Sequence, residues 1–188
     1  MRPAIFCLPG LLIGLALAGC DRQKAVEPQA SEAPAVAYPT GRLDRSHHGD
    51  AAPDLLFEDG DGRPVRLSAF RGRPVLVNLW ATWCGPCVVE MPSLDALAAR
   101  AGQQLEIVAI SQDLNGRQRV SDFFAAHGFR RLEPYLDPDM RLMPALGLDT
   151  LPTTILYDAE GREVWRMTGM AEWGDARTTR LLAEAGGG

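Results

Sequence analysis

The sequence predicts an α/β fold in which a central mixed β-sheet is flanked by helices on both faces. The first supporting observation is that short apolar runs, typical of buried strands, alternate with longer segments of helical periodicity. The second is a composition of 46% hydrophobic and 23% charged residues, which is that of a globular protein. The third is the length of 188 residues, which leaves room for one ordinary domain and an additional segment.

The folded domain is predicted to begin at residue 52 with a β-hairpin. Two apolar segments flank the turn-forming residues 58–63, a pattern typical of two antiparallel strands. The apolar run at 74–79 is bounded by turn-forming residues and is typical of a buried parallel strand. A helix is predicted from about residue 84 to residue 101.

The rest of the domain continues this alternation, and no internal repeat is visible. The predicted elements are, in order, a strand at 105–110, an amphipathic helix at 117–127, a short strand at 132–136, a short helix at 140–146, an antiparallel hairpin at 153–157 and 163–168, and a closing helix at 175–185. This order predicts a mixed sheet rather than a purely parallel one.

The first 19 residues are predicted to be a secretory signal. Arg2 supplies a positive start, and the apolar segment that follows is interrupted by a Pro-Gly pair, so it is poorly suited to a membrane span of about 20 residues. Residues 17–20 (LAGC) resemble the bacterial lipobox, which is cut before a cysteine that receives a lipid. Cys20 is therefore the expected lipidation site, and an ordinary signal with an accidental cysteine is the alternative. Asp21 resembles an inner-membrane retention signal.

Residues 20–51 are predicted to be the lipidated cysteine and a flexible tether. They are rich in Ala, Pro, Glu, Gln, Ser and Gly and show no hydrophobic periodicity. We expect this tether to hold the domain, residues 52–188, at the inner membrane of a bacterium, facing the periplasm. His47 and His48 lie in the tether, where two adjacent histidines are usually solvated.

Charge and cysteine usage exclude other classes of protein. The net charge of −5 and the lack of a basic block argue against a nucleic-acid partner. Four cysteines are too few and too clustered for a fold stabilised by many disulfides. If Cys7 leaves with the signal and Cys20 is lipidated, Cys84 and Cys87 are the pair that remains for chemistry.

The sequence WCGPC at residues 83–87 is the predicted redox centre, because it follows a strand and begins a helix. Unpaired N–H groups and the macrodipole at a helix N-terminus favour the thiolate form of Cys84, the nucleophile that attacks a partner disulfide. The i, i+3 spacing places Cys87 one turn further along the same face, where it can resolve the mixed disulfide. Pro86 suits the first helical turn.

Metal binding is the alternative interpretation of this cysteine pair. A structural zinc site needs about four ligands, and the domain offers only His127 on a predicted apolar helix face. Met140 and Met143 could suggest Cu(I), although methionine more often fills gaps in a core. We therefore expect no metal site.

Residues 75–94 (VLVNLWATWCGPCVVEMPSL) closely resemble the TlpA/ResA/CcmG group of thioredoxin-like, membrane-tethered thiol–disulfide oxidoreductases. Residues 52–72 resemble the hairpin that precedes the first central strand in this group, and residues 147–158 resemble its cis-proline segment. The resemblance covers about residues 52–185. It implies a thioredoxin-like fold with an N-terminal β-hairpin extension, and no cofactor besides a redox-active Cys84–Cys87 disulfide.

The resemblance also implies roles for single residues. Pro152 matches the cis-proline that faces the dithiol, and the alternative is a trans proline that begins a strand. Glu90 matches a carboxylate three residues after the second cysteine, close enough to exchange protons with the Cys87 thiol; a solvated surface residue is the alternative. Asn78 stands where cytosolic thioredoxins keep a buried acid, which shifts proton handling toward Glu90. The expected substrate-binding residues are Trp83, Gly85, Pro86 and Leu151, and Trp80 is expected to pack beside the dithiol.

The function implied by this resemblance is a cell-envelope dithiol reductant of protein disulfides. The implied clients are apocytochrome c CxxC(H) pairs or copper-site cysteines, and the implied electron source is a membrane donor of the thiol–disulfide type. The Gly-Pro pair between the cysteines, shared with thioredoxin, favours reduction over oxidation, and we expect a monomer. The alternatives are a thiol peroxidase of the redoxin branch, whose P-x-x-x-T-x-x-C pattern is broken here by Val77 and Ala81, and a Cu(I)-binding metallochaperone.

Overall fold

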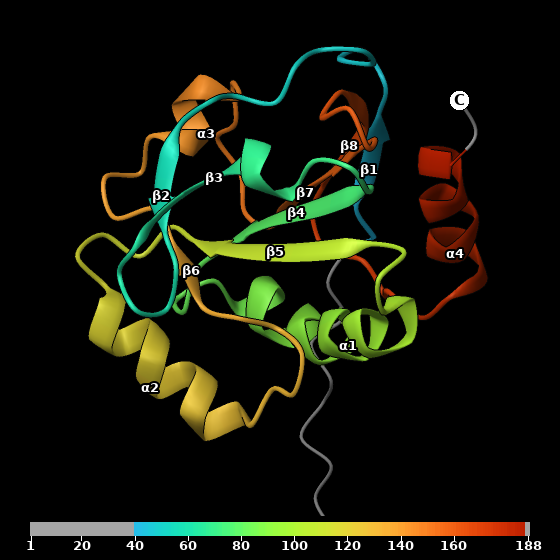
Figure 1. Cartoon of the computed structure of the whole chain (residues 1–188). Coiled ribbons are helices and arrows are strands. Elements are labelled where there is room, and N and C mark those ends of the chain that lie inside the picture. Colours follow the sequence, from blue (N-terminus) through green and yellow to red (C-terminus); the bar gives the residue numbers. More distant parts are fainter. Residues whose placement is uncertain (1–39, 187–188) are drawn as a thin grey trace, which may run out of the picture. The chain divides into compact units, whose positions relative to one another are not determined.

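A mixed sheet forms the centre of the computed structural model, which describes residues 40–186 (Figure 1). In this part of the chain, eight strands run in the order β1-β8-β7-β4-β5-β6-β2-β3. Their bounds are Arg42–Asp44 (β1), Leu56–Glu58 (β2), Pro64–Arg66 (β3), Val75–Trp80 (β4), Glu106–Ser111 (β5), Tyr135–Leu136 (β6), Thr153–Tyr157 (β7) and Glu163–Thr168 (β8). Because β4 is parallel to β5 and antiparallel to β7, the predicted mixed sheet is confirmed.

Helices cover both faces of the sheet, as predicted. Their bounds are Gly85–Ala101 (α1), Arg117–His127 (α2), Leu142–Ala145 (α3) and Ala176–Leu182 (α4), with 3₁₀ turns at Leu67–Phe70 and Ala183–Gly186. One core cluster contains buried residues of α1, α2 and α4 together with Leu76 and Trp80 of β4. A second cluster joins α3 and the first 3₁₀ turn to Val77 and Leu79 of the same strand. The alternation along β4 therefore feeds one core on each face.

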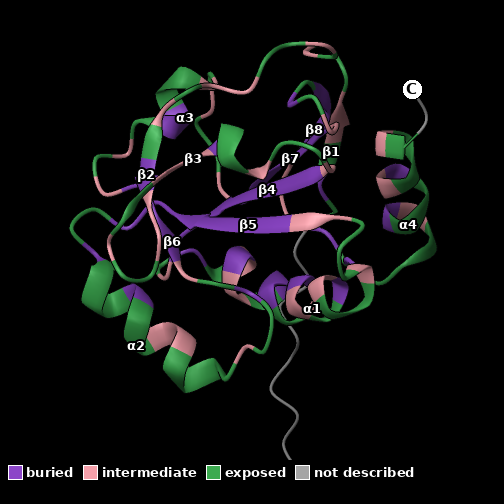
Figure 2. Ribbon diagram, viewed as in Figure 1, coloured by how far each residue is buried: buried purple, intermediate pink, exposed green. Residues whose placement is uncertain are grey.

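The central strands are buried along almost their whole length, which explains their continuous apolar sequences (Figure 2). Two short elements are smaller than predicted. The strand predicted at 132–136 is reduced to β6, because Pro134 has no N–H to donate to a neighbouring strand. The helix predicted at 140–146 begins only at Leu142, because Met140 has a left-handed backbone with φ of 51°.

The sheet topology brings three chain segments to one edge. In the parallel pair β4 and β5, Trp80 lies opposite Ser111, so both strands end together. Since β7 is antiparallel to β4, its first residue, Thr153, pairs with Leu79 near the same edge. The loop after β4, the loop after β5 and the segment before β7 therefore meet where α1 begins.

The folded domain begins earlier than residue 52, so part of the predicted tether is wrong. Residues 42–44 form β1, which pairs antiparallel with β8 along three residues. Arg45 forms a bidentate ion pair with Glu184, and Leu43 packs against the core. The strand β1 could not be predicted from composition, because Leu43 is the one apolar residue in it. The strand is stabilised by pairing with β8 at the edge of the sheet.

The expected signal at 1–19, the lipidation site Cys20 and the first part of the predicted tether lie outside the described residues. Within residues 40–186, none of the helices has the length and apolar character needed to cross a membrane.

Candidate redox site

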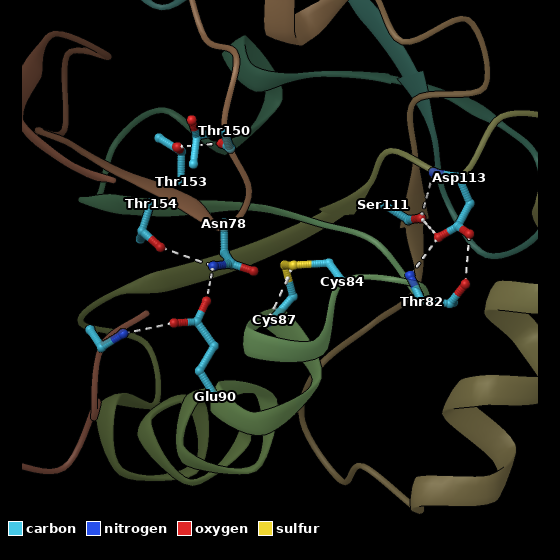
Figure 3. The surroundings of a disulfide bond; sticks show 11 residues. Asn78, Thr82, Cys84, Cys87, Glu90, Ser111, Asp113, Thr150, Thr153 and Thr154 are labelled. Carbon is cyan, nitrogen blue, oxygen red and sulfur yellow. Dashed lines mark hydrogen bonds between the residues drawn. A yellow bond between two sulfur atoms is a disulfide. The ribbon is translucent and has the colours of Figure 1, made fainter. Parts of the chain in front are cut away.

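Cys84 and Cys87 form a disulfide at the N-terminus of α1 (Figure 3). Cys84 is the N-cap residue, with an extended backbone, and its sulfur accepts a hydrogen bond from the Cys87 N–H at 3.3 Å. Pro86 carries no N–H, so the first turn leaves few donors without a partner. A donor aimed at sulfur, at the positive end of a helix dipole, stabilises negative charge on Cys84 after reduction.

Exposure differs sharply around the disulfide. Cys84 retains 6% of its accessible surface, whereas Cys87 is fully buried. Beside them, Trp83 is 65% exposed, Gly85 is exposed and Pro86 is half-buried. A protein that approaches this surface therefore meets Trp83 and Gly85 first and can reach sulfur only at Cys84.

The segment before β7 carries the cis peptide bond of the described chain, between Leu151 and Pro152. The Pro152 carbonyl accepts a hydrogen bond from Gly169 N–H at 2.8 Å, and the Thr153 hydroxyl donates to the Thr150 carbonyl at 2.8 Å. These contacts fix the segment that leads into β7, where Figure 3 shows the bond between Thr150 and Thr153.

Glu90 lies inside the protein, at 2% exposure, so the alternative of a solvated surface residue is wrong. One carboxylate oxygen accepts from the Asn78 side-chain amide at 2.7 Å, and the other from the Ala171 N–H at 2.9 Å. The same Asn78 nitrogen donates to the Thr154 hydroxyl at 2.9 Å, across the β4–β7 register. The carboxylate is thus joined to β4, β7 and the segment after β8.

Burial is the main cause that raises the pKa of Glu90 from 4.5 to about 7, because a low-dielectric surrounding disfavours the charged form. Hydrogen bonds from Ala171 and Asn78, and the nearby Trp173 indole, act in the opposite direction. That indole N–H is buried and has no hydrogen-bond partner in the described chain. A carboxyl group that titrates near neutral pH, one helical turn from Cys87, is suited to exchanging protons.

A second buried carboxylate, Asp113, holds the loop that leads into the redox centre. It accepts hydrogen bonds from the Thr82 backbone N–H at 2.8 Å, from the Thr82 hydroxyl at 2.6 Å and from the Ser111 hydroxyl at 2.7 Å. Burial would raise the pKa of Asp113, but these bonds and the Arg119 guanidinium outweigh it and hold the pKa below its ordinary value. The carboxylate therefore fixes Thr82, the neighbour of Trp83.

The sequence interpretation missed Asp113, and it missed that Asn78, which also donates to Thr154, holds Glu90. An acid just after a buried strand was the available signal for Asp113, but nothing local showed that it reaches the loop after β4. For Asn78, the signal was an amide within an otherwise apolar strand, since a buried polar side chain needs partners.

Two of the residues considered for metal binding, Met143 and His127, make their contacts away from the disulfide. Met143 belongs to the core cluster on the face of the sheet opposite Cys87. The His127 ring is exposed and stacks on Phe129, with ring centroids 5.6 Å apart. Trp80, by contrast, is fully buried in the cluster that contains both cysteines, as expected for a packing residue.

Comparison with known proteins is consistent with this geometry. The Redoxin family model matches residues 47–182. The chain is 34% identical over 122 residues to the thiol–disulfide oxidoreductase ResA of Bacillus subtilis. This alignment covers 64% of this chain and 67% of ResA. Among solved structures, the thiol:disulfide interchange protein DsbE of Chlorobium tepidum aligns with a TM-score of 0.63 and 26% identity, over 73% of this chain and 97% of that chain.

The exposed lipoprotein thioredoxin of Streptococcus pneumoniae aligns with a TM-score of 0.61 and 25% identity, over 70% of this chain and 99% of that chain. The family match spans most of the chain and includes the disulfide. The chain therefore belongs to the Redoxin family and is a thiol–disulfide oxidoreductase related to ResA.

Proposed function

We propose that the protein reduces disulfides of other proteins through Cys84, with Cys87 as the resolving cysteine. The observation that carries this proposal is the asymmetry of the disulfide, in which Cys84 is the reachable sulfur at a helix N-cap and Cys87 is buried. Trp83 and Gly85 provide an exposed, uncharged surface beside Cys84 on which a client segment can rest. Leu151, which precedes the cis peptide bond, offers backbone that can pair with an extended client segment.

The reaction proceeds in two exchanges. The Cys84 thiolate attacks one sulfur of the client disulfide, so a Cys84–client bond forms and the second client sulfur leaves as a thiolate. Cys87 then loses its proton and attacks the Cys84 sulfur, which forms the Cys84–Cys87 disulfide and releases the first client sulfur. Two electrons pass to the client. A donor dithiol then supplies two further electrons, which reduce the Cys84–Cys87 disulfide for the next turnover.

Glu90 is the proposed acceptor of the Cys87 proton. Its pKa of about 7 allows it to take and release a proton near neutral pH. Because Asn78 and Ala171 occupy its two oxygens, the proton passes through a rearranged contact or a bridging water. Asn78 cannot serve as the acid itself, since an amide does not titrate in this range.

We further propose where the protein is anchored in the cell and which proteins it reduces. The lipobox-like residues 17–20 support lipid attachment at Cys20, an inner-membrane location and a domain that faces the periplasm. The S. pneumoniae relative is itself an exposed lipoprotein, which supports the same arrangement. We infer that the clients are apocytochrome c CxxC(H) pairs or copper-site cysteines, and that a membrane protein of the thiol–disulfide type supplies electrons to a monomer.

Trapping of mixed disulfides tests this proposal. Cys87→Ser removes the resolving sulfur, so we expect clients to accumulate in disulfide linkage to Cys84, identified by mass spectrometry after acid quenching of cell envelopes. Cys84→Ser is the matched control and should trap no client. Equal trapping by both variants, or trapping by neither, would contradict the proposed roles of the two cysteines.

A further inference from the structure

One polar atom at the redox site has no partner although it is completely buried. Asn78 is 0% exposed, and its side-chain oxygen has no hydrogen-bond partner among the described residues. Its nitrogen turns toward Glu90 and Thr154, whereas the oxygen points toward the Cys84–Cys87 disulfide (Figure 3). A buried carbonyl without a donor is unfavourable, so this atom calls for an explanation.

The position of Asn78 on β4 also places its side chain on the side of the sheet that carries the disulfide. Leu76 and Trp80, two residues before and after it on β4, belong to the core cluster that contains Cys87. Because side chains alternate along a strand, Asn78 faces the same layer, beneath α1. Glu90, to which it is bonded, lies one helical turn from Cys87 on the buried face of that helix.

The orientation of the carboxamide is set by its partners. Both acceptors on the nitrogen side, the Glu90 carboxylate and the Thr154 hydroxyl, use the two hydrogens that the amide nitrogen provides. While Glu90 is ionised, the opposite orientation would place a carbonyl oxygen against a carboxylate oxygen, and two acceptors repel. The oxygen of Asn78 is thus held toward the sulfur atoms by contacts that do not involve them.

Neither sulfur can donate a hydrogen bond while the disulfide is intact. Reduction by a donor dithiol breaks the Cys84–Cys87 bond and forms a disulfide in the donor, and two electrons and two protons enter this protein. Cys84 sits at the helix N-terminus, which favours release of its proton to solvent. Cys87 is buried and keeps its proton as a neutral S–H group, the donor that the site lacks in its oxidised form.

We propose that the Asn78 side-chain oxygen accepts a hydrogen bond from the Cys87 thiol in the reduced protein, and thereby favours the reduced state. This inference rests on the proposed function only in taking Cys87 as the buried, resolving cysteine. It gives Asn78 two separate tasks, since the nitrogen positions Glu90 and the oxygen holds the thiol. The contact disappears in each turnover when Cys87 becomes part of the disulfide.

Infrared spectroscopy of the full chain tests the contact in the wild-type protein. The chain contains two asparagines, Asn78 and the exposed Asn115, so ¹³C labelling of asparagine side-chain carbonyls gives two bands. Asn115→Gly assigns them, because glycine tolerates the left-handed backbone there, with φ of 49°. On reduction with dithiothreitol, we expect the Asn78 band to move to lower frequency and the Asn115 band to stay. An Asn78 band that stays or rises would overturn the proposal.

A redox titration tests whether the Asn78 side-chain oxygen favours the reduced state. Asn78→Leu removes the acceptor, and we expect the equilibrium with glutathione to shift about tenfold toward the disulfide, or about 30 mV. Thr154→Val removes one partner of the nitrogen and leaves the oxygen in place, so it should change the equilibrium by less than about twofold. An equal shift in both variants, or none in Asn78→Leu, would contradict the proposal. The chemical reductant keeps both readouts independent of whether clients are trapped at Cys84.

Discussion

Burial makes Glu90 a carboxyl group that titrates near neutral pH. The cause that raises its pKa is loss of solvent, and the donors Asn78 and Ala171 only partly offset this effect. The folded protein therefore binds a proton at Glu90 between pH 4.5 and about pH 7, where the unfolded chain has released it. The stability that this proton provides is present below pH 4.5 and is lost as the pH rises through about 7.

The Glu90→Gln variant isolates this effect in the oxidised protein. The substituted amide cannot titrate, so the variant does not lose stability when Glu90 of the wild type ionises. Between pH 4.5 and about pH 8, we expect the free energy of unfolding of the variant to rise by about 3 kcal/mol relative to that of the wild type. Denaturant unfolding at a series of pH values measures the difference. The exposed Glu160→Gln variant is the control and should show no such trend. A difference between Glu90→Gln and wild type that is constant with pH would rule out the raised pKa.

At the scale of elements, the redox site depends on loops that are held from neighbouring strands. The loop after β4 carries Thr82 and Trp83, and its anchor is Asp113, which follows β5. Because the anchor is a buried carboxylate with several donors, its removal leaves the Thr82 N–H and the Ser111 hydroxyl without their acceptor.

We therefore expect Asp113→Ala to lower the free energy of unfolding by about 3 kcal/mol and to slow the reaction of reduced Cys84 with a model disulfide. Urea unfolding measures the first effect and stopped-flow exchange the second. Asp122→Ala, at an exposed position on α2, is the matched control and should change neither. Wild-type stability in Asp113→Ala would show that the loop is held by other contacts.

The first strand also reaches the redox site through the chain segment after β8. A Cβ at Gly41 would lie 2.7 Å from the Gly169 carbonyl oxygen, so Gly41 allows the two backbones to approach. Gly169 donates to the Pro152 carbonyl, and Ala171, two residues later, donates to Glu90. Displacement of β1 should therefore disturb the support of both residues.

Gly41→Ala is predicted to lower the free energy of unfolding by about 1–3 kcal/mol, because the added methyl group overlaps backbone that cannot move cheaply. Thermal or urea unfolding measures this loss. The exposed neighbour Arg42→Ala should stay within about 0.5 kcal/mol of the wild type. If both variants unfold like the wild type, β1 contributes little to the domain.

The sequence predicted those elements whose patterns are local. The strand β4 was predicted from an apolar run and the helix α1 from a helical pattern that begins at the cysteine pair, and both were confirmed. The strand β1 was not predictable, because its stability comes from pairing with β8, which is distant in the chain. The bond between Asn78 and Glu90 likewise joins a strand to a helix, so it depends on packing that one sequence does not reveal.

For the whole molecule, the domain is expected to work at a membrane through a lipid on Cys20. Full-length protein expressed in bacteria should sediment with the membrane fraction, because two or more acyl chains provide stable anchoring. Cys20→Ala should move it to the soluble fraction, and Cys7→Ala, within the expected signal, should not. Membrane sedimentation of Cys20→Ala equal to that of the wild type would contradict lipid attachment at this residue.

The central claim is that Cys84 attacks a client disulfide and Cys87 resolves the product. An acid-quenched time course of the reduced protein with insulin, mapped by mass spectrometry, tests it most directly. We predict a transient insulin adduct on Cys84, followed by one Cys84–Cys87 disulfide for each insulin disulfide reduced, and a persistent Cys84 adduct in Cys87→Ser. An adduct on Cys87, or insulin reduction without formation of the Cys84–Cys87 disulfide, would contradict the account.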